Sequence, residues 1–145
     1  MKKLLMAAFC VMIVNPVWAD VKITEGWIKK PVGGVKNVAA FMTISNEGDE
    51  DIRLLSVNSS SSEMTHLHDV KVSDGVVRMV PMDSLTVRAN SQAVLKMGGL
   101  HVMLKGMKEK LSSGDWIAIA FEFDDGTRVT KQFEVKAQQA MSAGM

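Results

Sequence analysis

Cysteine is almost absent from this chain, and its one cysteine, Cys10, lies in a stretch with the pattern of an export signal. Residues 1–19 start with a methionine and two lysines, continue with an uninterrupted apolar run and end in Val-Trp-Ala. This order is typical of a cleaved signal peptide, and the apolar run is too short to span a bilayer as a helix. Phe9 is a poor residue to precede a lipid-modified cysteine. We therefore expect cleavage before Asp20 and export to the periplasm.

The predicted mature chain, residues 20–145, then has no thiol and no disulfide, although it is sent to a compartment where disulfides persist. Any site for a soft metal must be built from methionine sulfur. A thioether carries no proton and forms no disulfide, so it keeps its binding capacity in an oxidising compartment, although oxidation to the sulfoxide would destroy it.

An excess of charge of either sign is also missing. The full chain has 17 basic and 16 acidic residues, and removing the two lysines of the signal leaves 15 against 16. No basic surface is expected to attract nucleic acid or anionic lipid. The sequence also contains no nucleophile elbow, no phosphate-binding glycine loop, and no CxxC or HExxH motif. We expect a protein that is not an enzyme and has no membrane span in its mature chain.

No window of helical length shows an apolar period near 3.6. Eight to ten short strands, separated by turns every eight to twelve residues, instead predict an all-β Greek-key sandwich or barrel. The mature length suits one domain, which we place at residues 20–136, followed by a flexible tail at 137–145. Most aromatic side chains fall in predicted strands, and we expect them all, Trp116 included, to lie in the core.

Two hairpins stand out. Residues 116–123 and 128–135 form the last one. Residues 65–72 and 76–80 form an earlier one, closed by Asp-Gly, which is the strongest hairpin signal in the chain.

Four residues form the main candidate site: His68, Met79, His101 and Met103. Ten residues separate the first from the second, twenty-one the second from the third, and one the third from the fourth. A single strand histidine is more often a solvated or hydrogen-bonded residue, and a single methionine more often fills the core. Taken together, two imidazoles and two thioethers are neutral ligands that suit Cu(I) better than other common biological metals.

The earlier hairpin gives this set a geometric basis. If Asp74 and Gly75 form a two-residue turn, His68 lies opposite Pro81, and Met79 is its diagonal neighbour on the same face, roughly 7–8 Å away. The other two candidates, at positions i and i+2 of a later strand, also share a face. The sequence does not show whether the fold brings these two segments together.

Two alternatives remain open at this stage. A zinc enzyme would use the three imidazoles of His66, His68 and His101 with an open coordination position, although no general base stands out and the methionines would be idle. The other alternative is a metal-free β-sandwich interaction domain. His66 is interpreted as a neighbour of the site, Met64 and Met82 as possible rim residues, and no role is assigned to Met141 and Met145.

The four residues and their spacing match the signature of the PCu(A)C family of periplasmic copper chaperones, which this chain resembles over residues 21–136. Further matching segments are Gly26-Trp27-Ile28, residues 39–46, residues 74–79 and residues 98–104. The chain departs from the family where Val70 and Val72 replace common methionines and His66 replaces a frequent acidic residue.

The resemblance implies a cupredoxin-like β-barrel. It also implies a monomeric carrier that binds one Cu(I) through His68, Met79, His101 and Met103. The acceptor would be a cytochrome c oxidase subunit, at its copper centre, or another copper chaperone.

Overall fold

The computed structural model describes residues 20–137, and within them it contains ten β-strands and no helix. The predicted signal peptide and residues 138–145 of the predicted tail lie outside the described residues. Nothing in the described part of the chain forms a helix able to cross a membrane. The strands are β1 (Val21–Lys29), β2 (Val38–Asn46), β3 (Ile52–Asn58), β4 (Ser62–Ser73), β5 (Val76–Met82), β6 (Leu85–Val87), β7 (Ser91–Leu95), β8 (His101–Met107), β9 (Trp116–Phe123) and β10 (Arg128–Lys136).

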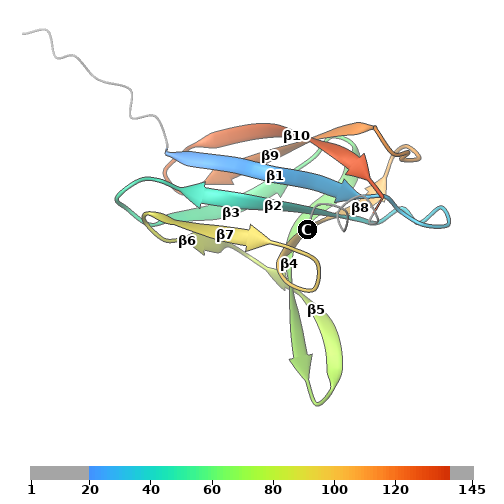
Figure 1. Cartoon of the computed structure of the whole chain (residues 1–145), viewed down its shortest axis with the longest axis horizontal. Coiled ribbons are helices and arrows are strands. Elements are labelled where there is room, and N and C mark those ends of the chain that lie inside the picture. Colours follow the sequence, from blue (N-terminus) through green and yellow to red (C-terminus); the bar gives the residue numbers. More distant parts are fainter. Residues whose placement is uncertain (1–19, 138–145) are drawn as a thin grey trace, which may run out of the picture.

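The strands form one continuous sheet in the order β5-β4-β8-β2-β1-β10-β9-β3-β6, with β7 paired to β2 off this path. The sheet folds over on itself, because β3 also packs beside β4 and β6 beside β7. Strands β1 and β10 are parallel, and the other pairs are antiparallel. The predicted all-β fold is confirmed. Figure 1 shows the β4–β5 hairpin projecting from the body of the molecule.

The core lies between the two layers and follows the alternation of the strands. Along β9, Ile117, Ile119, Phe121 and Phe123 are buried. Trp116 begins the same strand, but its side chain lies on the opposite face and is 60% exposed. The prediction that it belongs to the core is therefore wrong. Period-2 alternation, and not aromatic character, decides the direction of its side chain.

The β4–β5 hairpin has the register that the sequence predicts. Ser73 lies opposite Val76, and His68 lies opposite Pro81. The turn residues Asp74 and Gly75 have φ values of 52° and 74°. A two-residue turn with positive φ at both central positions matches the right-handed twist of its strands, which is why Asp-Gly fixes the register.

Candidate metal centre

Strand β4 lies between β5 and β8, and this order brings the two predicted ligand segments together. His68 is directly opposite His101 of β8 on one side and directly opposite Pro81 of β5 on the other. Directly opposed residues share a face of the sheet, and so do residues two positions apart on one strand. Met79 therefore lies on the face that carries the two histidines.

Met103 belongs to the same face, since it is two positions from His101, and it is directly opposite His66 of β4. It is half-buried, whereas Met79 on the projecting hairpin is 61% exposed. All four predicted ligands thus occupy one face of three adjacent strands. Met79 is the member that lies open to solvent.

The two histidines are buried polar residues in contact with each other. His68 is 6% exposed and His101 is 3% exposed, and their rings meet edge to face with centroids 5.7 Å apart. Nδ1 of His68 and Nε2 of His101 are buried and have no hydrogen-bond partner. A buried nitrogen without a partner costs free energy, and an ion bound between these adjacent rings would give such nitrogens a partner.

A backbone carbonyl sets the tautomer of His101. Its Nδ1 lies 2.9 Å from the carbonyl oxygen of Gly99. A carbonyl can only accept, so Nδ1 carries the proton and Nε2 keeps its lone pair. The nitrogen without a partner is therefore the one able to bind a metal, and the carbonyl orients the ring as an outer-shell group does in metal sites.

The surroundings of His68 favour its neutral form. Burial lowers the pKa of His68 below the ordinary 6.5, and its electrostatic interactions with Lys105, His101 and His66 lower it further. A neutral imidazole is the form that binds a metal.

Two aromatic side chains extend this face beyond the histidines. Phe41 of β2 lies 6.3 Å from His101 and 5.1 Å from Trp27 of β1, measured between ring centroids. Phe41 is 5% and Trp27 6% exposed, yet neither belongs to the main core cluster. They form an apolar wall beside His101, away from Met79. The prediction that both side chains are buried is confirmed. Their position beside His101 was not predicted, because strand pairing was needed to see it.

His66 is the neighbour that the sequence analysis expected. Its ring is parallel to that of His68 within 4°, with centroids 6.2 Å apart. Within residues 20–137, no three His, Cys, Asp or Glu side chains come together in a group that could hold a metal ion. The zinc alternative with His66, His68 and His101 therefore lacks its three-ligand group in this structure.

The other methionines differ in burial and in their position relative to the candidate site. Met82 is directly opposite Leu67 and packs against the core, so it is not a rim residue. Met64 is 54% exposed and, two positions before His66, shares its face. Met97 is exposed in a loop and Met107 is buried in the core.

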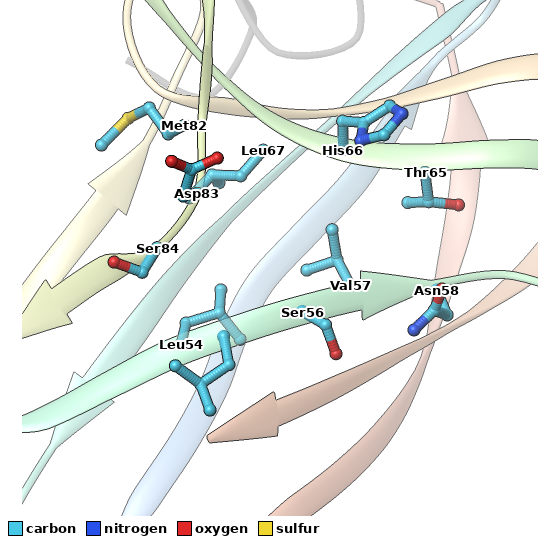
Figure 2. A pocket seen from close by; sticks show the side chains of 11 residues that line it. Leu54, Ser56, Val57, Asn58, Thr65, His66, Leu67, Met82, Asp83 and Ser84 are labelled. Carbon is cyan, nitrogen blue, oxygen red and sulfur yellow. The ribbon is translucent and has the colours of Figure 1, made fainter. Parts of the chain in front are cut away.

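A cavity of about 200 Å³ lies next to the site but opens on the other side of β4. Figure 2 shows Asp83 and Ser84 at one end and Asn58 and Thr65 at the other, with the ring of His66 on the far side of the β4 ribbon from Val57. The cavity is therefore separate from the histidine pair. It is lined by Leu54, Leu55, Ser56, Val57, Asn58, Thr65, His66, Leu67, Met82, Asp83 and Ser84.

A family model described as "Putative lipoprotein LpqE-like" matches residues 21–135, most of the chain. The chain belongs to the LpqE-like family. A relative in Leifsonia xyli subsp. xyli (strain CTCB07), named "Putative lipoprotein Lxx21020", is 30% identical to this LpqE-like chain over 108 residues. The match covers 74% of the chain and 64% of that relative, so the chain spans just under two thirds of the relative's length.

Solved structures share the fold. The copper-bound PCuAC domain from PmoF2 is 22% identical, with a TM-score of 0.70, over 82% of this chain and 94% of that domain. The solution structure of CuI-DR1885 from Deinococcus radiodurans is 25% identical, with a TM-score of 0.58, over 80% of this chain and 79% of that one. The predicted resemblance to the PCu(A)C family and the cupredoxin-like fold of this LpqE-like chain are confirmed.

Proposed function

We propose that this protein is an exported copper carrier that binds one Cu(I) through His68, Met79, His101 and Met103. The observation that carries the proposal is the pair of buried imidazole nitrogens without partners, on the sheet face that also holds the two thioethers. This donor set is neutral and includes soft sulfur, which suits Cu(I).

The comparisons support this choice of metal. One similar structure is described as a copper-bound PCuAC domain and another as the Cu(I) form of DR1885. Export is supported by the lipoprotein description that the family and the relative share.

The arrangement suits transfer better than storage. Cu(I) is the cargo, and its d10 shell imposes little geometric preference, so ligands can exchange one at a time. His68 and His101 are buried and oriented, while Met79 is exposed on the outermost strand. A partner can therefore replace Met79 first, while the histidines still hold the ion. No step of bond-making catalysis is involved, and the protein acts as a carrier and not as an enzyme.

The acceptor we propose is the copper centre of a cytochrome c oxidase subunit, reached directly or through another copper chaperone. This part of the proposal rests on the family resemblance.

A copper titration tests the binding step. The purified protein should bind one Cu(I) per chain against a competing chelator, and X-ray absorption should find sulfur among the nearest neighbours of the metal. The double variant His68→Ala, His101→Ala should bind weakly. If the nearest neighbours of the metal were nitrogen and oxygen alone, this result would contradict the proposal and favour the zinc alternative.

A further inference from the structure

We propose that the open edge of β5 binds an extended segment of a partner protein in which apolar and acidic side chains alternate. The inference rests on the proposed function in one respect, since it takes the partner to be the protein that exchanges copper with this chain. The binding itself does not require the metal.

Strand β5 is the last strand at one end of the sheet, and it pairs only with β4. In the two-residue hairpin, the closing pair Ser73–Val76 is hydrogen-bonded, and the backbone groups of alternate β5 residues then point outward. Pro81 fits this alternation, because proline has no N–H and occurs on edge strands where that group would face solvent. The N–H and C=O groups of Val77 and Met79 are thus directed at the open edge, ready to pair with an added strand.

One face of the hairpin is apolar and continuous with the metal centre. Val72 lies opposite Val77, and Val70 lies opposite Met79, on the face that carries His68. Val72 is 69% exposed, Val77 66% and Met79 61%. Exposed apolar side chains gathered on a projecting element mark an interaction surface and not a solvated hairpin.

The other face carries two positive charges at directly opposed positions, Lys71 and Arg78, and one negative charge, Asp69, whose Oδ1 accepts a hydrogen bond from the backbone N–H of Val70. Like charges placed opposite each other on neighbouring strands are destabilising. Neither takes part in an ion pair within residues 20–137. Acidic side chains from an added strand would relieve this repulsion.

These two faces together define the partner's chemistry. An added strand alternates its side chains between the faces, so apolar residues would meet Val77 and Met79 on one face. On the other face an acidic residue would meet Arg78, which stands between Val76 and Val80 on β5. Lys71 lies beside Arg78 on the next strand inward. A second copy of this chain fits poorly, because its own β5 would bring another Arg78 to the positively charged edge. The partner residue beside Met79 would also point toward the metal face, where a sulfur or imidazole ligand could take over the copper.

A peptide titration on the full, copper-free protein tests the inference. The probe is a short labelled peptide in which valine and glutamate alternate around a central methionine, and the control peptide has lysine in place of glutamate. The glutamate peptide should shift the backbone amide NMR signals of Val76–Met82, and the lysine peptide should not.

Three variants sharpen the result. Lys71→Glu, Arg78→Glu should weaken the glutamate peptide at least about tenfold and allow the lysine peptide to bind. Val77→Pro removes an outward N–H without removing a bond to β4, so it should abolish binding while the amide spectrum of β4 is kept. Lys131→Glu, an exposed charge reversal on β10, should change nothing.

Several outcomes would overturn the inference. One is that the glutamate peptide at millimolar concentration causes no shifts at β5, or causes shifts elsewhere in the chain. Another is that the Val77→Pro variant binds the peptide unchanged. Shifts that depend on protein concentration without any peptide would show that the chain pairs with itself. A Cu(I) titration of the same preparations separates the two proposals. Loss of copper binding with intact peptide binding would remove the proposed function alone.

Discussion

At the candidate metal centre, different contacts act on the two histidines. His101 is fixed by the carbonyl of Gly99, and the pKa of His68 is held down by burial and by Lys105. The sequence predicted the histidines and methionines, because their spacing is a local property of the chain. It could not predict the influence of Lys105 on His68, since that depends on the pairing of β8 with β4, and it did not predict the local contact between His101 and the carbonyl of Gly99, which depends on the backbone conformation before β8.

The thioethers should distinguish copper from zinc. Met79→Ala and Met103→Ala should each weaken Cu(I) binding at least about tenfold, about 1.4 kcal/mol, and leave Zn(II) binding nearly unchanged, because a thioether is a poor zinc ligand. Competition titrations with both metals measure the effect. His66→Ala is the matched control and should have a small effect on Cu(I). If it costs as much as His68→Ala, three imidazoles bind the metal.

Protons should compete with copper at the histidines and not at the methionines. Cu(I) affinity should fall with decreasing pH, and the part due to His68 should begin below the ordinary histidine value of 6.5, since its pKa is lowered by burial first and by Lys105, His101 and His66 next. If His68 and His101 are both ligands and both take up a proton in the apo protein, the dependence should approach two protons per copper at low pH. Affinity measured across a pH series should lose most of this slope in the double variant His68→Ala, His101→Ala.

In the copper-free protein, the free energy of unfolding should also depend on pH through His68. Well above pH 6.5, His68 is neutral in both the folded and the unfolded chain. Below that pH the unfolded chain takes up a proton first, so the free energy of unfolding should decrease as the pH falls toward the lowered pKa of the folded state. Denaturant unfolding of the apo protein and of His68→Ala would measure the difference, and equal pH profiles would contradict it.

At the scale of strands, local and distant pairings differ in how far the sequence determines them. The β4–β5 register follows from Asp74-Gly75, and the prediction that His68 lies opposite Pro81 is confirmed. The pairing of β4 with β8 joins segments more than thirty positions apart, and no local signal specifies it. The candidate site depends on this pairing, so its residues could be selected from the sequence and their convergence could not.

Strand β1 offers a test of how packing positions the aromatic wall. Its pairing with β2 is interrupted by a register shift between Thr24 and Trp27, and a Cβ added to Gly26 within this bulge would collide with the buried ring of Phe133. Gly26→Ala should therefore cost about 1–3 kcal/mol in the free energy of unfolding and displace Trp27, with a change in its fluorescence. Gly99→Ala meets only an ordinary contact, 3.7 Å from the carbonyl oxygen of Lys96, and should stay within about 0.5 kcal/mol. A stable Gly26→Ala protein with unchanged fluorescence would show that the bulge does not position the wall.

At the scale of the whole molecule, the site is a row of side chains that crosses five strands. It runs from Met79 on β5 through His68, His101 and Phe41 to Trp27 on β1. Its buried end is fixed by the body of the sheet, and its exposed end lies on the projecting hairpin (Figure 1). The proposed copper carrier would need this asymmetry, because its ion would be held at one end and reached at the other.

The N-terminal end of the domain bears on how the protein is processed. The carbonyl of Asp20 accepts a hydrogen bond from the backbone N–H of Glu47 at 2.7 Å, and β1 starts at the next residue. The predicted cleavage before Asp20 would keep this contact in the mature domain. The intact mass of the exported protein should correspond to residues 20–145, and Cys10→Ser should leave this mass and the release of the protein unchanged. The lipoprotein description of the family makes the opposite result informative. A chain that starts at Cys10, carries lipid and enters the detergent phase would show that this protein is anchored and that the predicted cleavage site is wrong.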